Sequence, residues 1–277
     1  MRVDRVAEDV YTFVSDMYAQ VVATVILTGQ GAVVVDAMPF PTEAREVAAF
    51  IEDKEGPHNV RYVINTHHHA DHVYGTYLFE GAEVIAHDKC RELLAEYGQA
   101  RLLRAKQEIA ALADVELRLP DITFGQEMYL HLGGTDIQLL YTPGHTVDGI
   151  SVFVAGDKVL IAGDAMLPVP HIVGGDVEQL KASLKSIKAL KPNFIVQGHG
   201  EVLLRGEVDD TIDDSINYLS CIVEKVSALA ERGDLPSALR DIDIESCGKS
   251  RIPLDGLVNK LHLDNLVALY KEIAVAN

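Results

Sequence analysis

The chain has 277 residues, of which 48% are hydrophobic and 24% are charged. This length and composition suffice for a large buried core and exclude an intrinsically disordered chain, so we expect one large domain or one domain with a helical appendage. The net charge of −18, from 42 acidic and 24 basic residues, excludes nucleic acid from the expected partners because a polyanion would be repelled.

The apolar segments are too short for a membrane span. The longest of them, such as residues 21–27, fall far short of the roughly 20 residues that cross a bilayer. The N-terminus, MRVDRVAEDVYTF, mixes acidic with basic residues and lacks the apolar stretch of a signal peptide. We therefore expect a cytoplasmic protein that does not bind membranes.

The cysteines do not form a recognisable motif. Cys90, Cys221 and Cys247 are odd in number, widely separated and without CxxC spacing. This pattern argues against a disulfide framework and against a thiolate zinc site. We expect all three to be small core residues.

The first part of the chain predicts strands, a helix and a strand that ends in histidines. A helix is expected over 42–54, where apolar residues recur near helical spacing, and Gly29 and Gly31 mark a tight turn between two strands. The strands are expected at 10–14, 21–27, 32–36 and 60–65.

The middle of the chain predicts a second strand-rich region. Helices are expected over 73–79, over 89–113 with Gly98 as a break, and over 177–187 with Asp176 as the N-cap. The strands are expected at 83–86, 128–132, 136–141, 150–154, 158–161 and 193–196. Two strand-rich halves with helices between them indicate an α/β or α+β fold, with two sheets packed face to face and helices outside.

Two amphipathic helices are expected near the C-terminus, over 208–226 and 255–273. The first begins in the acidic segment EVDDTIDD, residues 207–214, where carboxylates suit the helix dipole. Exposed apolar faces on these helices would permit a homodimer.

Four segments share one design, in which a β-rich run ends and a metal-type ligand follows directly. They are INTHHHADH at 64–72, LLYTPGHT at 139–146, LIAGDA at 160–165 and FIVQGHG at 194–200. Strand ends on one edge of a sandwich converge in space, and the glycines beside these ligands allow sharp turns. The four segments can therefore line one cavity.

The ligands in these segments are more than one catalytic ion needs. Zinc takes imidazole and carboxylate ligands, and its catalytic sites keep an open position. Two ions about 3.5 to 4 Å apart, bridged by a carboxylate and a hydroxide, would use them all. The sequence thus predicts two divalent metal ions, with zinc as the first expectation and iron or manganese as alternatives.

These motifs, HxHxDH at 67–72, GHT at 144–146, GD at 163–164 and GHG at 198–200, resemble those of the metallo-β-lactamase superfamily. The resemblance implies a four-layer αββα sandwich, with the catalytic domain over 1–205 and a helical extension over 206–277 packed on it. It implies that one metal binds His67, His69 and His145. It implies that the other binds Asp71, His72 and His199, with Asp164 bridging the two.

Several further residues are candidates for supporting roles. His68 occupies a variable position of HxHxDH, so the resemblance leaves it outside the ligand set. Asp36 ends a strand and is either a support for the ligand histidines or a turn cap. The remaining histidines outside the motifs, His58, His87, His131 and His262, are expected to be surface or structural groups.

Two residues are candidates for contact with the substrate. His171 lies in a loop soon after Asp164 that should overlook the cavity. Tyr18 lies between the first two strands and could polarise a carbonyl, as tyrosines do in some lactonase relatives. The alternative for Tyr18 is an aromatic residue packed on a strand edge.

The predicted reaction is metal-assisted hydrolysis of a small-molecule substrate. A metal-bridging hydroxide would attack an ester, lactone, thioester or β-lactam carbonyl, with Asp71 and Asp164 orienting it. The C-terminal part lacks the basic cluster of glutathione thioesterases in the superfamily. Two alternatives stay open: a mononuclear iron enzyme similar to persulfide dioxygenases, and a non-catalytic metal-binding module.

Overall fold

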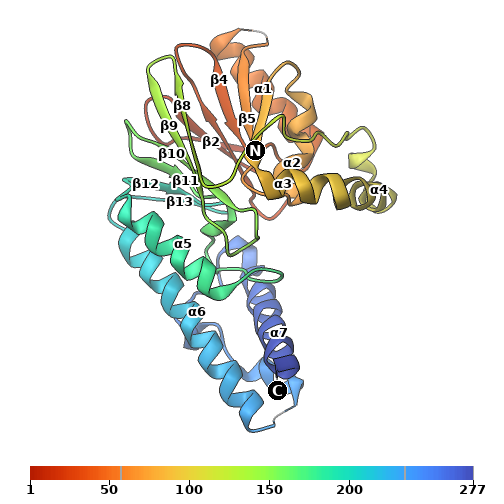
Figure 1. The fold of residues 1–277 in the computed structure, drawn as a ribbon, viewed down its shortest axis with the longest axis vertical. Coiled ribbons are helices and arrows are strands. Elements are labelled where there is room, and N and C mark those ends of the chain that lie inside the picture. Colours follow the sequence, from red (N-terminus) through yellow and green to blue (C-terminus); the bar gives the residue numbers. More distant parts are fainter. Residues whose placement is uncertain (57, 234, 277) are drawn as a thin grey trace.

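The computed structural model describes residues 1–56, 58–233 and 235–276. In this part of the chain two β-sheets pack face to face, with helices against their outer faces (Figure 1). One sheet has seven strands in the order β1-β2-β3-β4-β5-β6-β7, and the other has six in the order β13-β12-β11-β10-β9-β8. The predicted αββα sandwich is confirmed.

The strands of the first sheet are β1 (Arg2–Arg5), β2 (Val10–Val14), β3 (Val22–Ile26), β4 (Ala32–Val35), β5 (Val60–Ile64), β6 (Glu83–His87) and β7 (Ile122–Phe124). Those of the second are β8 (Glu127–Leu132), β9 (Thr135–Tyr141), β10 (Ile150–Val154), β11 (Val159–Ile161), β12 (Phe194–Val196) and β13 (Val202–Leu203). The helices are α1 (Pro41–Glu55), α2 (Ala70–Val73), α3 (Asp88–Leu93), α4 (Gln99–Glu108), α5 (Val177–Ala189), α6 (Val208–Glu231) and α7 (Val258–Ala276).

The core between the sheets consists of valine, isoleucine and leucine side chains from both inner faces. Ile64 and Val35 of the first sheet belong to the same buried cluster as Leu139 and Val152 of the second. On the outer face of the first sheet α1 buries Val47, and on the second sheet α5 buries its own apolar stripe. Each sheet therefore has both faces covered, as the apolar composition of its strands requires.

Strand direction brings the loops of the site to one edge. β4 and β5 run parallel, as do β11 and β12, so the carboxyl ends of each pair lie side by side. Backbone hydrogen bonds join the two sheets there, from Val22 N to Gly198 O (2.9 Å) and from Ile150 N to Thr66 O (2.9 Å). The loops that carry the predicted ligands are thus held at the junction of the sheets.

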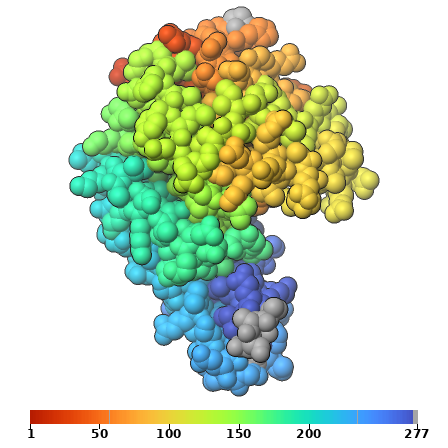
Figure 2. All heavy atoms as spheres, in the orientation of Figure 1, coloured from red at the N-terminus to blue at the C-terminus, as the bar shows by residue number. Residues whose placement is uncertain are grey.

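The C-terminal helices α6 and α7, drawn in light to dark blue in Figures 1 and 2, form a lobe that packs on α5 through a shared buried cluster. Figure 2 shows this lobe and the yellow segment around α4 projecting from the sandwich, with a recess between them. Among the described residues, no helix has the length and apolar composition needed to cross a membrane.

One expectation about the cysteines is wrong. Cys90 and Cys247 are buried, but Cys221 is only half buried, and its Sγ lies 2.7 Å from Cys247 Sγ. The sequence did not indicate this pair because the two cysteines are 26 residues apart. They meet because the chain turns back after α6 and packs against that helix.

Candidate metal centre

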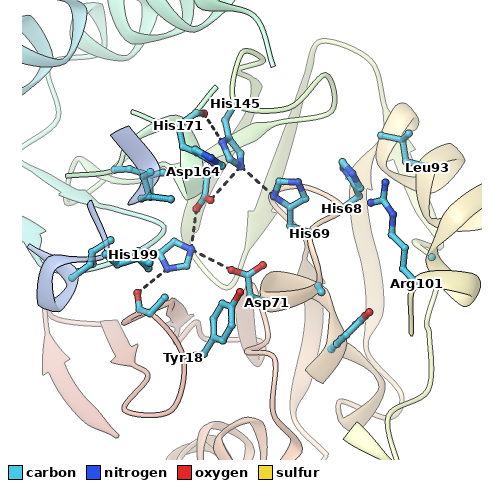
Figure 3. Close-up of a pocket in the computed structure, with 18 of the residues that line it drawn as sticks. Tyr18, His68, His69, Asp71, Leu93, Arg101, His145, Asp164, His171 and His199 are labelled. Carbon is cyan, nitrogen blue, oxygen red and sulfur yellow. Dashed lines mark hydrogen bonds and ion pairs between the residues drawn. The ribbon is translucent and has the colours of Figure 1, made fainter. Parts of the chain in front are cut away.

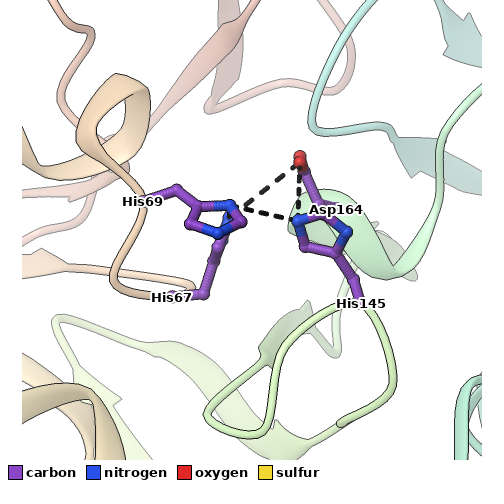
Figure 4. Close-up of side chains that lie close together, drawn as sticks. All are labelled: His67, His69, His145 and Asp164. Carbon is purple, nitrogen blue, oxygen red and sulfur yellow. Dashed lines mark hydrogen bonds and ion pairs between the residues drawn. The ribbon is translucent and has the colours of Figure 1, made fainter. Parts of the chain in front are cut away.

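Seven histidine and aspartate side chains converge where the two sheets meet. They form two groups, and within each group the ligand atoms lie within 4.8 Å of one another. The first group is His67, His69, His145 and Asp164, shown in Figure 4, and the second is Asp71, His72 and His199. The structure therefore brings together all seven residues that the sequence predicts as ligands.

The histidine-rich loop changes conformation in its middle. β5 ends at Ile64, and α2 begins at Ala70 with His69 as an extended N-cap residue (φ −68°, ψ 146°). Asp71 and His72 consequently lie on the first turn of a helix, whereas His69 lies in the loop before it. This change explains how ligands close in sequence can serve two different groups.

Close-packed glycines shape the turns after β11 and β12. Gly163 has a φ of +51°, and a Cβ atom on Gly198 would lie 1.9 Å from Asp164 Oδ1. Because β11 and β12 are parallel, these turns place Asp164 beside His199. Only a residue without a side chain fits at position 198 while Asp164 keeps its place.

The turn before His145 packs directly on α5. Gly144 has a φ of +134°, and a Cβ atom there would lie 2.3 Å from the Leu180 Cα atom. Glycine allows both the backbone conformation and the close approach.

A residue of α7 holds the loop behind His145. The His145 Nδ1 atom donates to the main-chain oxygen of His171 (2.7 Å). On either side of His171, the Asn265 side chain accepts from Ile172 N (2.9 Å) and donates to Pro170 O (2.7 Å). We call this arrangement the Asn265 clamp, and it links the C-terminal lobe to a predicted metal ligand.

Asp164 lies between the two groups. Its Oδ2 atom is 3.3 Å from His145 Nε2 and 3.9 Å from His67 Nε2. Its Oδ1 atom is 3.3 Å from His72 Nε2 and 3.6 Å from His199 Nε2. Each carboxylate oxygen thus faces one group, which is the arrangement of a bridging ligand.

The segment that carries these ligands matches a known family. The family model described as the metallo-beta-lactamase superfamily matches residues 18–199, more than half of the chain. The chain belongs to this superfamily. The resemblance inferred from the short motifs is therefore confirmed by a match over residues 18–199.

The chain is similar to several proteins named hydroxyacylglutathione hydrolase. It is 29% identical over 152 residues to the hydroxyacylglutathione hydrolase of Pelagibacter ubique, covering 54% of each chain. It is 30% identical over 192 residues to that of Nitrobacter hamburgensis, covering 68% of this chain and 67% of the relative. The chain spans from about half to two thirds of the length of the first curated relatives it matches.

A solved structure shows the same fold over nearly the whole chain. A metallo-beta-lactamase family protein from Thermus thermophilus superposes with a TM-score of 0.73, covering 98% of this chain and 95% of that one. The sequence identity is 17%, so the match describes the fold alone.

Four of the histidines predicted as ligands have the ring nitrogen that faces away from the centre hydrogen bonded. The pairs are His67 Nδ1 with Thr66 Oγ1 (3.1 Å), His72 Nδ1 with Asp36 Oδ2 (2.7 Å), His145 Nδ1 with His171 O (2.7 Å) and His199 Nδ1 with Ala19 O (2.9 Å). An oxygen acceptor places the proton of a neutral ring on Nδ1, which leaves Nε2 free to bind a metal.

The contacts in the first group fit a bound cation. His69 Nδ1 lies 3.0 Å from His67 Nε2 and 3.2 Å from His145 Nε2, two nitrogens that carry no proton in this tautomer. Asp164 Oδ2 adds another acceptor facing His145. A tetrahedral ion with bonds of about 2.0 to 2.1 Å holds its ligand atoms about 3.3 Å apart, close to these spacings.

Two buried polar atoms at the centre have no hydrogen-bond partner among the described residues. His72 Nε2 and Asp164 Oδ1 lie 3.3 Å apart as a possible ion pair, but neither forms a hydrogen bond with a described residue. Such atoms are costly unless an ion or water satisfies them. Their position between the two groups supports a metal-binding role.

The protonation states also suit metal binding. Burial lowers the pKa of His67, and it lowers the pKa of His69 to about 3. Burial opposes ionisation of Asp71 and Asp164, but neighbouring histidines outweigh it and hold both carboxyl pKa values below their usual range. Neutral imidazole and ionised carboxylate are the forms that bind metals.

His72 and His199 differ from these histidines. Burial lowers the pKa of each, but the surrounding carboxylates, chiefly Asp36 at His72 and Asp164 at His199, outweigh it and raise the pKa. The second group therefore lies in a field that attracts positive charge. A divalent cation would compete with protons for these nitrogens.

Both predicted substrate-contact residues line the cavity over the centre (Figure 3). Burial raises the pKa of the Tyr18 hydroxyl and lowers the pKa of His171 to about 4. Tyr18 also packs edge to face with Phe40, at 6.4 Å between ring centroids, so a packing role and a cavity role coexist.

Some residues of the site were not predicted from the sequence. His68 is turned to Asp148, whose carboxylate accepts from His68 N (2.8 Å) and contacts His68 Nδ1 (2.9 Å). Asp148 is fully buried and fixes the histidine-rich loop. Its only signal is a position shortly after GHT. Arg101 and Asn265, on helices distant in sequence, gave no signal.

Proposed function

We propose that this protein is a dinuclear metal-dependent hydrolase that cleaves an ester or thioester bond of a small molecule. The observation that carries the proposal is the position of Asp164, whose two carboxylate oxygens face separate groups of ligand atoms. The similarity to proteins named hydroxyacylglutathione hydrolase favours the thioester and ester among the candidate carbonyl substrates.

The ligand set suits zinc best. It consists of five imidazoles and two carboxylates, and imidazole-rich sites also bind iron and manganese. Two divalent ions held here would lower the pKa of a water molecule towards 7 and withdraw electron density from the substrate carbonyl.

The chain's own residues would orient the reactants. Asp71 and Asp164 stay ionised and can accept hydrogen bonds from the attacking water. Tyr18 keeps its proton at neutral pH because burial raises its pKa, so its hydroxyl can donate to the carbonyl oxygen. His171, with a pKa of about 4, is neutral at pH 7 and can exchange a hydrogen bond with the substrate.

The test combines metal analysis with a substrate panel. We expect two metal ions per chain and hydrolysis of thioesters or esters in a panel that also contains lactones, β-lactams and phosphoesters. His67→Ala should reduce turnover by roughly 100-fold or more, since an inner ligand should matter at least as much as its supports. His131→Ala is the matched control, because 74% of the His131 side chain is exposed and its one ion pair among the described residues is with Asp136.

Other outcomes would contradict the proposal. A single iron with formation of sulfite from glutathione persulfide would indicate a persulfide dioxygenase. Full metal occupancy without turnover of any substrate would indicate a binding module. Unchanged activity of His67→Ala would show that the centre is not the site of reaction.

A further inference from the structure

The cavity above the metal centre has a volume of about 380 Å³ and two chemically different ends. Its apolar wall comes from six leucines: Leu93, Leu94, Leu167, Leu254, Leu257 and Leu261. Among the described residues that line it, Arg101 is the only lysine or arginine. The distribution of these residues around the centre is informative about the substrate.

One end of the cavity belongs to the C-terminal lobe. Leu261 lies on the first turn of α7, and Leu254 and Leu257 lie just before the helix. Leu254 is 6% exposed and reaches the turn after His199, where a Cβ atom on Gly200 would lie 3.3 Å from Leu254 Cδ2. Lys260, also on α7, is exposed, pairs with Asp264 (2.8 Å) and does not line the cavity. This end can therefore bind an apolar group.

The other end carries Arg101, on the first turn of α4. In Figure 3 Arg101 points toward His68, on the side of His69 away from His145 and His199. It follows the π-helical turn Leu94–Gly98, which extends α3 into α4 without a break and so directs the start of α4 at the cavity. π-Helical turns are frequent at functional sites.

Arg101 has no acidic partner among the residues that the structure describes. In the described part of the chain no carboxylate forms an ion pair with it, and its guanidinium instead contacts the Tyr97 ring, 5.7 Å from the guanidinium carbon to the centroid. Acidic residues outnumber basic ones by 42 to 24, and three other arginines, Arg2, Arg118 and Arg251, form ion pairs with carboxylates. What sets Arg101 apart is its position in the lining of the cavity. A cation left unpaired at a cavity is available to an anionic ligand.

Resting on the proposed hydrolase function, we infer that the substrate is an ester or thioester with a carboxylate group that binds Arg101. Its apolar group lies against Leu254, Leu257 and Leu261, and the bond that is cleaved lies over the metal centre between them. A guanidinium binds a carboxylate through two parallel hydrogen bonds, which fixes orientation as well as charge. A single cation suits one carboxylate better than a polyanion.

Matched thioesters test this inference. The first pair consists of the hexanoyl thioesters of 3-mercaptopropionate and of 3-mercaptopropionamide, which differ only in a carboxylate or carboxamide on the thiol side. The second pair has the same difference at the far end of the acyl chain. We expect KM to be at least about 10-fold lower for the carboxylate member of one pair, as for one charge-assisted contact.

Substitutions assign the preference to Arg101. Arg101→Ala should raise KM for the preferred carboxylate about 10-fold and leave the carboxamide unchanged, and Arg101→Lys should restore part of the preference. Arg104→Ala is the matched control, since Arg104 is exposed on the same helix and does not line the cavity. Leu257→Ser should reduce the preference for hexanoyl over acetyl thioesters.

Binding separates failure of this inference from failure of the proposed function. The thioether 3-(hexylthio)propionate cannot be hydrolysed, and calorimetry can compare it with its amide on metal-loaded wild type and Arg101→Ala. A carboxylate preference that disappears in Arg101→Ala supports the inference even if no thioester is cleaved. Equal preferences in the two proteins, in binding and in KM, would overturn it while leaving hydrolysis intact.

A second inference comes from an independent feature, the Cys221 and Cys247 pair. Cys221 lies on α6, and Cys247 ends a short 3-10 turn whose chain leads on to Leu254. The sulfur atoms are 2.7 Å apart, and a disulfide requires about 2.03 to 2.05 Å. We propose that this pair is a site of reversible disulfide formation.

The oxidant would be a small disulfide such as oxidised glutathione. Cys221, the more exposed thiol, attacks it as a thiolate and releases one glutathione thiol, and Cys247 then loses its proton and displaces the second from Cys221. Two protein thiols and one glutathione disulfide give one protein disulfide and two glutathione thiols. The greater exposure of Cys221 favours it for the first attack, and burial, which raises the pKa of Cys247 to about 12, agrees with this order.

Peptide mass spectrometry after incubation with oxidised glutathione tests the site. We expect a cross-linked peptide pair containing Cys221 and Cys247, with Cys90 still reduced because it is fully buried. Cys247→Ser should stop at the mixed disulfide on Cys221, and Cys221→Ser should give no product. A stable mixed disulfide on Cys221 in the wild-type protein, without the cross-link, would overturn the proposal.

Discussion

Asp36 shows how one residue can support both groups of ligands. It directly follows β4 and has a φ of +58°. Its carboxylate accepts from Thr66 N (2.8 Å), Thr66 Oγ1 (2.7 Å) and His72 Nδ1 (2.7 Å). Thr66 in turn contacts His67. Of the two roles expected from the sequence, this geometry favours support of the ligand histidines, although the residue also forms the turn.

Asp36→Asn should weaken metal binding without unfolding the protein. Asparagine tolerates a positive φ and keeps the shape of aspartate, but it removes the charge that orients His72. We expect the affinity for the second ion to fall about 10-fold to 100-fold, measured by competition with a chromophoric chelator. Asp136→Asn, at the exposed pair with His131, is the control, and equal affinities in both variants would exclude this role.

Lys249 is a buried cation that costs stability. Its residue is 7% exposed, its Nζ donates to Ser215 Oγ (3.0 Å), and burial lowers its pKa to about 8 although Asp214 opposes the shift. Between pH 8 and the unfolded value of 10.5 the unfolded chain binds more protons. The free energy of unfolding should therefore rise with pH across this window.

Lys249→Met should stabilise the protein at pH 7 by about 1 to 3 kcal/mol, because a neutral side chain needs no desolvation of charge. The advantage should shrink as pH rises from 8 to 10.5, since wild-type Lys249 then loses its proton. Chemical denaturation of both proteins at pH 7, 9 and 10.5 measures the difference. A difference that stays constant with pH would show that Lys249 does not titrate in this way.

At the scale of elements, the sequence predicted long strands and helices well and short edge strands poorly. Amphipathic spacing located α1, α5 and α6, and Asp176 caps α5 by accepting from Gln179 N (2.8 Å) as expected. The strands β1, β7 and β13 were missed. β1 is largely exposed and polar, and the other two have three and two residues, so no periodic pattern could form.

The expected helix break at Gly98 does not occur. The chain instead passes through a π-helical turn there, and a Cβ atom on Gly98 would lie 2.7 Å from Leu117 Cδ2. Glycine is present for close packing and not to end the helix. The candidate ligand groups could be predicted because each follows a recognisable strand. The position of Arg101 could not, because it depends on the direction of α4, which packing decides.

Because the turn at Gly144 is tightly packed, we predict that one added methyl group lowers the free energy of unfolding strongly. Gly144→Ala would force a Cβ atom into the backbone of Leu180 at a positive φ, so α5 would have to move. We expect a loss of about 2 to 4 kcal/mol in the free energy of unfolding.

Gly156→Ala is the matched control for this change. Gly156 lies between β10 and β11, and a Cβ atom added there would meet no atom within 4 Å beyond its chain neighbours. Denaturant melts should show little change for Gly156→Ala. Equal stabilities of the two variants would refute the packing argument.

For the whole molecule, metal binding and folding stability should be linked. The ligands come from both sheets, so the ions can bind tightly only to the folded chain. At free ion concentrations about 100 to 1,000 times Kd, each ion would add about 2.7 to 4.1 kcal/mol to the free energy of unfolding. Removal of metal by a chelator should lower Tm, and re-addition of zinc should restore it.

His67→Ala provides the control for this melt. Its Tm should respond less to chelation than that of the wild-type protein, because it lacks a ligand of the first group. An identical Tm for the metal-loaded and metal-free wild-type protein would contradict the linkage.

Through the Asn265 clamp, the C-terminal lobe affects the order in which the parts of the metal centre come together. His145 is oriented through His171, and the His171 loop is held by Asn265, some 93 to 95 residues further along the chain. During synthesis the loop after His145 would emerge long before the helix that holds it. Complete metal loading would thus wait for α7 to dock, which would protect a half-made chain from trapping an ion in an incomplete site.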